Sequence, residues 1–391
     1  MKESFESYQD TSKKLDHDMV TWLEDGTKKS AQWRTATNYP SPSEVVVTKD
    51  TIKADQAYQL ALDGKALLWR SDFPNARHLL QALSRRSLRQ PRSNQVKNTK
   101  SIQEIFFDQR AIQEKRAKVL NQLLVPLSAD YVIQLPRAQD VGLACEQVFG
   151  SSQNDSLISL RALLAIVSAH EWRKKGVQIP QLGRRIYPHF GVFSPLRSEY
   201  LDLVDQAPLS PNWKSAYDIG TGTGVLAAIL SKRGLLEITA TDLYQRAVLC
   251  ARANILSFGM QERIQVIQSD LFPSGRADLI VCNPPWIVAE PSSLLDSAVY
   301  DPKATMLRSF LSGVKDHLNI GGEAWLVISD IAEHLGLRSR EQLLEWIALG
   351  GLKVVGRIDT RPVHGRARDQ EDTLYQVRSQ EITSLWRLQS I

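Results

Sequence analysis

The residues Asn283-Pro284-Pro285-Trp286 form the most chemically specific pattern in the chain. They directly follow the short apolar run 279–282, which predicts a strand. Two consecutive prolines cannot continue a strand inside a parallel sheet, so they stiffen the backbone into a turn. The Asn283 side-chain oxygen and the Pro284 carbonyl can then accept hydrogen bonds from one planar NH2 group, while Trp286 offers a flat stacking surface. This pattern predicts a site that binds an amide or amino nitrogen.

A planar nitrogen of this kind has a delocalised lone pair and is therefore a weak nucleophile. Two fixed acceptors raise its electron density and direct it at an electrophile, which is catalysis by positioning and electrostatics without a covalent intermediate. A general base is not required, because the proton can leave after the transfer. Asp301 and His364 are the candidates if one is used.

A glycine-rich loop is the second pattern, and it runs Asp218-Ile219-Gly220-Thr221-Gly222-Thr223-Gly224. Glycines at alternate positions let the backbone turn sharply and let a ligand lie against the main chain. The Asp218 carboxylate would repel the pyrophosphate of a dinucleotide, yet it suits a ligand with an ammonium and a sulfonium group. S-adenosylmethionine carries both groups, so the loop favours this cofactor.

Acidic residues also follow the next two predicted strands. Asp242, which precedes Leu243, is placed to accept hydrogen bonds from two ribose hydroxyls. Asp270 could accept from the amino group of adenine, and Leu271 could pack on the ring. Each acid could instead cap the helix that follows it. Taken together, they favour an adenosine-containing ligand.

The C-terminal part of the chain, residues 181–391, has the periodicity needed to position these groups. Short apolar strands alternate with helices, which predicts an α/β fold of the Rossmann-like, doubly wound type with a mostly parallel seven-stranded sheet. Ligands of such sheets bind beyond the carboxyl ends of the strands, where the acids and Asn283 fall. The predicted strands are 215–219, 237–241, 264–268, 279–282, 323–329, 353–358 and 382–388.

Two further segments precede this domain. Residues 1–45 are polar without clear periodicity and predict an arm or linker. Residues 46–180 have apolar residues at helical spacing and predict a mostly helical domain that could recognise the substrate. Residues 1–180 carry a net charge of +6 and residues 181–391 a net charge of −1. Between Phe73 and Lys100 there are basic residues and no acid, which fits either an RNA contact or a solvated helix face.

Composition narrows the class of protein. The chain has 391 residues, of which 43% are hydrophobic and 23% charged, so it can bury a large core. No apolar run is long enough for a membrane helix, and we expect a soluble cytoplasmic protein that does not bind a membrane. The three cysteines lack metal-site spacing, so neither a disulfide framework nor a metal site is expected. No feature of the sequence indicates the oligomeric state.

The loop, the acids and the Asn-Pro-Pro-Trp turn together resemble the class I S-adenosylmethionine-dependent methyltransferases with an Asn/Asp-Pro-Pro-aromatic motif. That group includes the HemK-like glutamine methyltransferases of peptide release factors, adenine-N6 enzymes of RNA and DNA, and guanine-N2 enzymes of ribosomal RNA. The resemblance covers residues 185–390, and the segment 189–197 resembles the one that closes over the cofactor. It implies that Asp218, Gly220, Thr221, Gly222 and Gly224 hold the methionine part, Asp242 and Leu243 the ribose, Asp270 and Leu271 the adenine, Asn283, Pro284, Pro285 and Trp286 the acceptor nitrogen, with Asn283, Phe193, Pro195 and Arg197 also touching the cofactor.

The identity of the methyl acceptor stays open at this point. Glutamine methyltransferases usually have Tyr where this chain has Trp286, and their N-terminal domain is much shorter. A protein glutamine or asparagine, an exocyclic amine of an RNA base, and a small amide- or amine-bearing metabolite are the alternatives. Two hypotheses from other classes are a nicotinamide-dependent oxidoreductase and a non-catalytic binding module.

Overall fold

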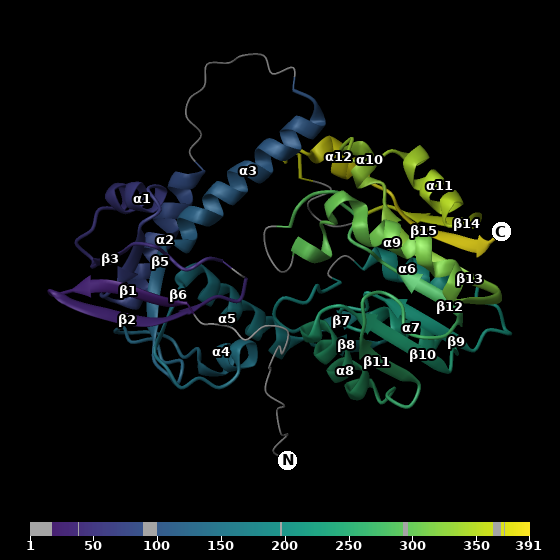
Figure 1. Ribbon diagram of the computed structural model, residues 1–391, viewed down its shortest axis with the longest axis horizontal. Coiled ribbons are helices and arrows are strands. Elements are labelled where there is room, and N and C mark those ends of the chain that lie inside the picture. Colours follow the sequence, from purple (N-terminus) through teal and green to yellow (C-terminus); the bar gives the residue numbers. More distant parts are fainter. Residues whose placement is uncertain are drawn as a thin grey trace. The chain divides into compact units, whose positions relative to one another are not determined.

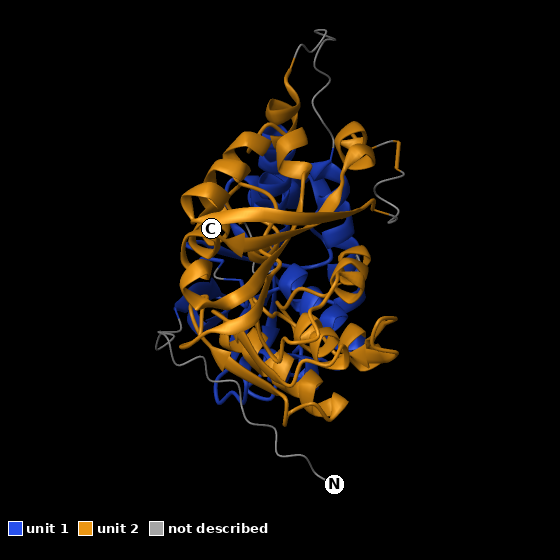
Figure 2. Cartoon of the chain, turned by 90° about the vertical axis from the view of Figure 1, so that its right-hand side faces the viewer, with its two compact units in different colours: residues 1–99, 107–171 blue, residues 100–106, 172–391 orange. Residues whose placement is uncertain are grey.

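The chain is organised in two compact units, each with its own sheet (Figures 1 and 2). The computed structural model describes residues 18–37, 39–88, 100–195, 198–291, 296–362, 369–370 and 372–391. The first unit consists of residues 1–99 and 107–171, and the second of residues 100–106 and 172–391. The division follows Glu171, whereas we predicted a boundary at residue 180.

The second unit contains a seven-stranded sheet with the strand order β11-β10-β9-β12-β13-β15-β14. The first five of these strands are parallel, and β15 runs antiparallel between β13 and β14. The predicted Rossmann-like, mostly parallel seven-stranded sheet is confirmed. The helices and strands of the second unit are β7 (Val177–Ile179), β8 (Arg184–Ile186), α6 (Glu199–Gln206), β9 (Ser215–Ile219), α7 (Val225–Lys232), β10 (Glu237–Asp242), α8 (Gln245–Phe258), β11 (Ile264–Gln268), β12 (Ala277–Cys282), α9 (Thr305–Gly313), β13 (Leu318–Ser329), α10 (Ile331–His334), α11 (Arg340–Leu349), β14 (Leu352–Thr360), α12 (Tyr375–Gln380) and β15 (Thr383–Ser390).

Helices cover both faces of this sheet (Figure 1). Along β12, Leu279 and Val281 pack with α6, α7 and α8, while Ile280 and Cys282 pack with α9 and α11. Alternate residues of a strand point to opposite faces, so a strand buried on both faces is apolar at every position. This is why the strands of this unit could be recognised as short continuous apolar runs.

The first unit contains a six-stranded sheet with the order β1-β2-β6-β5-β4-β3. Residues from all six strands contribute to one core, which includes Trp22 and Trp33. The helices and strands of this unit are β1 (Met19–Glu24), β2 (Thr27–Arg34), β3 (Val45–Thr48), α1 (Ala54–Leu62), β4 (Ala66–Trp69), α2 (Phe73–Ser87), α3 (Ile102–Asn121), β5 (Leu123–Leu127), α4 (Gly142–Phe149), β6 (Ser156–Ser159) and α5 (Leu160–Lys175). The first residues of α3 and the last residues of α5 belong to the second unit.

The prediction of a polar arm over residues 1–45 is wrong for residues 19–34, which form the β1–β2 hairpin. Asp25 and Gly26 connect the two strands, and both have positive φ angles of 51° and 77°. Asp-Gly is a favoured pair for such two-residue turns. Val20 and Trp22 are buried while their neighbours are exposed, which is the alternation of a half-buried strand.

The prediction of a mostly helical N-terminal domain must be corrected to an α/β unit. The expected helices are present, but Ala66–Trp69 and Leu123–Leu127 are strands where we expected helix. Both runs are fully buried, and the periodicity of four or five consecutive apolar residues does not distinguish a buried strand from a turn of buried helix. The helical spacing of the apolar residues around these two runs therefore led us to predict helix where the structure has strands.

Among the described residues, no helix is long and apolar enough to span a membrane. Within the same residues, no group of three or more His, Cys, Asp and Glu side chains is placed to hold a metal ion.

Trp325 provides a test of the second unit's core. Its side chain is fully buried in β13, edge-on to Trp213 at 6.5 Å between ring centroids, and its indole N–H donates to Glu323. Trp325→Ala should lower the free energy of unfolding by about 3–5 kcal/mol, because it leaves a large cavity in the core. Ile320→Ala is the control, since Ile320 is fully exposed and should change stability by less than about 0.5 kcal/mol. Urea denaturation of both variants measures this, and equal stability would contradict the assigned core.

Candidate functional site

The candidate site lies at the carboxyl edge of the seven-stranded sheet, where the strand order reverses. β9 lies between β10 and β12, and Asp218 pairs in register with Ala240 and Val281. Loops that leave β9 and β12 at such a point run in opposite directions, which opens a crevice between them. The structure thus brings the glycine-rich loop and the Asn-Pro-Pro-Trp turn to neighbouring strand ends.

Asp218 is completely buried at the end of β9. Its Oδ2 accepts a hydrogen bond from the Thr221 hydroxyl at 2.6 Å and one from the Ala227 N–H of α7 at 3.0 Å. Its Oδ1 has no hydrogen-bond partner among the described residues. Burial raises the pKa of this carboxyl to about 6, and the two hydrogen bonds oppose the increase. One oxygen therefore organises the loop and the other remains available.

The glycine-rich loop depends on backbone conformations that favour glycine. Gly220, Gly222 and Gly224 all have positive φ angles. A Cβ at Gly220 would lie 2.8 Å from Met306 Cε, and a Cβ at Gly224 would lie 3.3 Å from Ala251. A Cβ at Gly222 would meet no atom within 4 Å. The outer glycines therefore allow close packing, and the middle one leaves open space beside the backbone.

Asp242, at the end of β10, holds the glycine-rich loop from the other side. Its carboxylate accepts hydrogen bonds from the Gly222 N–H and the Tyr244 N–H, both at 3.0 Å. The Thr241 carbonyl accepts a further bond from the Thr221 N–H at 2.8 Å. Burial raises the pKa of Asp242, and these backbone hydrogen bonds oppose the increase. Each carboxylate oxygen retains capacity for another donor, as ribose binding would require.

The residues predicted for the adenine lie close to the Asp242 strand end. Asp270 is exposed, and Leu271 follows it with an unusual positive φ of 66°. The Leu271 carbonyl accepts a hydrogen bond from the Thr241 hydroxyl at 2.6 Å, which fixes this turn against β10. Leu243 is half exposed. Positive φ in a leucine is uncommon and often marks a functional turn.

The Asn-Pro-Pro-Trp turn begins directly after β12. The Trp286 indole N–H donates to Asn283 Oδ1 at 2.9 Å, the oxygen that we expected to face the acceptor nitrogen. Tyr200, a buried residue of α6, lies edge-on to the Trp286 ring with 6.4 Å between the ring centroids. Sequence reasoning did not identify Tyr200, because it reads as one more apolar position of its helix.

The segment before α6 is tied to the glycine-rich loop by Asn254. This residue of α8 is 1% exposed, its Oδ1 accepts from the Tyr187 N–H, and its Nδ2 donates to the Thr223 carbonyl, each at 2.9 Å. The signal in the sequence was an amide at a core position of an amphipathic helix, which we did not use. In the segment, Phe193 is partly and Pro195 fully buried, and Arg197 lies outside the described residues.

Asp301 has a structural role in this site. It is buried, and its two carboxylate oxygens accept hydrogen bonds from the Met306 and Leu307 N–H groups at the start of α9. This places Met306 against the glycine-rich loop. Burial raises the pKa of Asp301. His364, the other candidate base, lies outside the described residues.

Residues 186–345 match the family model of the methyltransferase small domain. Similar proteins include the release factor glutamine methyltransferase of Cereibacter sphaeroides, 31% identical over 37% of this chain and 57% of that protein. The tRNA1(Val) (adenine(37)-N6)-methyltransferase of Tolumonas auensis is 43% identical over 19% of this chain and 33% of that protein. The ribosomal RNA small subunit methyltransferase C of Sodalis glossinidius is 34% identical over 28% of this chain and 29% of that protein.

The chain therefore spans from about a third to just over half of the length of these relatives. The residues that the family model matches lie within the second unit.

The second unit has polar groups that fit S-adenosylmethionine. Among the buried side-chain atoms of the described residues that lack a hydrogen-bond partner, three belong to the glycine-rich loop and the segment before α6: Asp218 Oδ1, His189 Nε2 and Ser194 Oγ. The first suits the ammonium group of the methionine part, and the other two belong to the segment expected to close over the cofactor. Buried polar atoms are normally paired in a folded protein, so unpaired ones beside open backbone at Gly222 indicate a ligand.

The raised pKa of Asp218 gives a pH dependence to cofactor binding. The ionised carboxylate accepts from an ammonium group, whereas the protonated one does not, so affinity should fall as the pH drops through about 6. We expect S-adenosylmethionine to bind about fourfold more weakly at about pH 5.5 than at about pH 7.5. Asp218→Asn should bind weakly at both pH values and lose the dependence. Calorimetry tests this, and an unchanged pH profile in the variant would show that another group is responsible.

Proposed function

We propose that this protein is an S-adenosylmethionine-dependent N-methyltransferase that acts on a planar amide or amino nitrogen. The observation that carries the proposal is the register of two neighbouring strands. Cys282, the residue before Asn283, pairs with Ile219, the residue before Gly220. A nitrogen bound at the turn and a methionine part bound at the loop would thus start from adjacent positions of the sheet edge.

The proposed mechanism divides the work between the two strand ends. When bound, the cofactor supplies an electrophilic methyl group on sulfur, and transfer to nitrogen breaks the carbon–sulfur bond and leaves its electron pair on sulfur. Asp218 and the glycine-rich loop hold the donor, and Asp242 holds its ribose. The Asn283 oxygen and the Pro284 carbonyl accept from the NH2 group and point its lone pair at the methyl group. The proton leaves to solvent after transfer, since Asp301 is committed to capping α9.

Protein and RNA are the substrate classes that we propose first. The names of the similar proteins divide between a release factor glutamine and bases of tRNA and ribosomal RNA. A substrate of either kind would place the enzyme in the cytoplasm. A small metabolite with an amide or amine remains the alternative.

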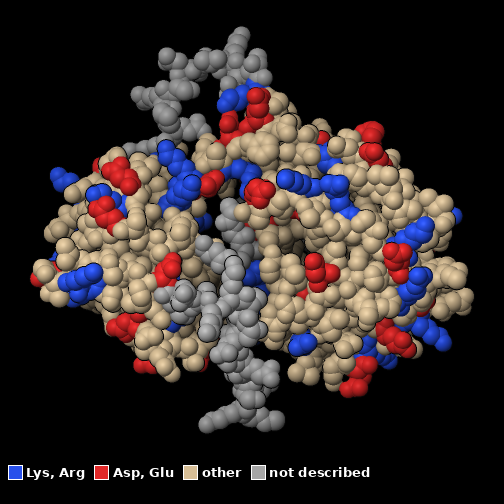
Figure 3. Space-filling view, in the orientation of Figure 1, with Lys and Arg blue, Asp and Glu red and all other residues tan. Residues whose placement is uncertain are grey.

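Charge gives only modest support to RNA. On the face that Figure 3 presents, Lys and Arg side chains are interspersed with Asp and Glu. Within the predicted basic stretch, Arg86 is paired with Asp55 at 2.6 Å, while Arg89, Arg92 and Lys97 lie outside the described residues. A nucleic-acid interface usually needs unpaired cations in a cluster.

The two hypotheses from other classes fit the site less well. A nicotinamide dinucleotide would bring its pyrophosphate to the loop whose buried carboxylate is Asp218. A binding module without catalysis would not need an oriented amide oxygen at the neighbouring strand end.

The first test identifies the acceptor. The full chain is incubated with methyl-labelled S-adenosylmethionine and a cell extract, and label is then measured in protein, RNA and small molecules. We expect label in protein or RNA, which the chemistry of the turn and the similar proteins both favour. Label in small molecules would move the proposal to the metabolite. Binding of NAD without binding of S-adenosylmethionine would overturn the function.

A second test separates catalysis from cofactor binding. Asn283→Ala should leave S-adenosylmethionine affinity within about threefold but lower kcat by about 10²- to 10³-fold, as the loss of one preorganised hydrogen-bond partner does elsewhere. Asp242→Ala is the matched control, because it should weaken cofactor binding by about 1.5–3 kcal/mol. Full activity of Asn283→Ala on the labelled fraction would exclude an amide or amino nitrogen as the acceptor.

A further inference from the structure

The side-chain oxygen of Asn283 is held by an aromatic residue of the chain itself. The indole N–H of Trp286 donates to Asn283 Oδ1 at 2.9 Å. Tyr200, a buried residue of α6, packs in turn against the Trp286 ring.

The two aromatic rings also fix each other. Their centroids are 6.4 Å apart and their planes meet at 89°, a favourable edge-to-face contact. Tyr200 is 5% exposed, and Trp286 packs against three apolar clusters of the second unit. Neither ring can rotate without breaking these contacts, so the indole N–H of Trp286 has a fixed position.

The indole N–H decides which end of the amide is the oxygen. An indole N–H can only donate, whereas a tyrosine hydroxyl both donates and accepts. If the Asn283 amide rotated by half a turn, two donors would face each other at Trp286. The oxygen keeps a second lone pair for the acceptor nitrogen, since a carbonyl oxygen accepts two hydrogen bonds.

We propose that Trp286 and Tyr200 are positioning residues that hold the Asn283 side-chain oxygen in the orientation required to accept from the substrate nitrogen. The proposal rests on the proposed function and gives Trp286 a role beyond the stacking surface expected from the sequence. It also brings α6 into the acceptor site, through a residue 83 positions before Asn283 in the chain.

Removal of the donor group and of the ring that holds it tests the proposal. Trp286→Phe keeps an aromatic ring but loses the indole N–H and part of the ring system, and Tyr200→Leu removes the edge-to-face contact with Trp286. On the labelled fraction, we expect each to lower kcat by about tenfold, because a loosely held amide points its oxygen correctly for less of the time. KM and S-adenosylmethionine affinity should stay within about twofold of the parent protein.

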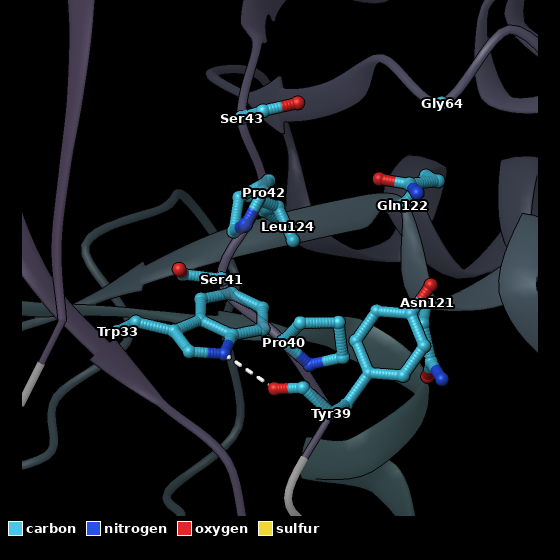
Figure 4. Close-up of a pocket in the computed structure, with 10 residues that line it drawn as sticks. All are labelled: Trp33, Tyr39, Pro40, Ser41, Pro42, Ser43, Gly64, Asn121, Gln122 and Leu124. Atoms are coloured by element: carbon cyan, nitrogen blue, oxygen red, sulfur yellow. Dashed lines mark hydrogen bonds between the residues drawn. The ribbon is translucent and has the colours of Figure 1, made fainter.

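Two variants of the first unit serve as controls for the chemical change itself. Trp33 donates its indole N–H to the Tyr39 carbonyl at 2.9 Å (Figure 4), and Tyr131 donates its hydroxyl to the Gly150 carbonyl at 2.8 Å. Both are buried. Trp33→Phe and Tyr131→Leu therefore make the same changes in comparable surroundings, and neither should change kcat. If they lower kcat as much as the site variants, the effect is general loss of packing and the proposal is wrong.

A double-mutant cycle separates positioning from structure. Once Asn283→Ala has removed the amide, Tyr200→Leu should cause no further loss of kcat. An equal loss in both backgrounds would mean that Tyr200 acts through the fold and would overturn the proposal. Inactive Asn283→Ala with fully active Trp286→Phe and Tyr200→Leu would overturn it while leaving the proposed function intact. Fully active Asn283→Ala would instead remove the proposed function.

Discussion

The buried carboxylate of Asp218 is the constraint on which the rest of the site depends. It sits at the point where the strand order reverses, and one of its oxygens joins β9 to the glycine-rich loop and to the start of α7. Burying a charge is unfavourable unless it is paired, which is why the pKa of this carboxyl rises to about 6. The unpaired oxygen makes the site incomplete without a cationic ligand.

The neighbouring groups are arranged around this carboxylate in two layers. Asp242 and Asn254 hold the loop by its backbone, through Gly222 and Thr223. Trp286 holds Asn283 by its side-chain oxygen, and Tyr200 packs against Trp286. The loop conformation and the amide orientation are therefore set before any substrate arrives, and such preorganisation is the main source of catalytic power for a transfer that needs no covalent intermediate.

Much of the second unit followed from its sequence because its signals are local. Alternate glycines and a pair of prolines demand particular backbone shapes wherever they occur, and strands buried on both faces are apolar at every position. The first unit gave weaker signals. Its strands of four or five residues lie beside long helices, and Ala66–Trp69 has no feature that separates it from a buried helical turn.

The contacts that sequence reasoning missed are those made across long separations. Asn254 and Tyr200 are ordinary residues of amphipathic helices, and their roles arise from what the fold places beside them. The Asp25-Gly26 turn was a different case. The Asp-Gly pair is a known hairpin signal, but we overlooked it together with the alternation of apolar and polar residues in the strand before it. Local chemistry could therefore be predicted, whereas the residues that orient it required the tertiary structure.

The chemical nature of the transferred bond tests the central claim most directly. The product of a reaction with ¹³C-methyl-labelled S-adenosylmethionine can be isolated from the labelled fraction, and its methyl carbon examined by two-dimensional NMR. Our account predicts a methyl group on an amide or amino nitrogen. A methyl group on oxygen or carbon would contradict it.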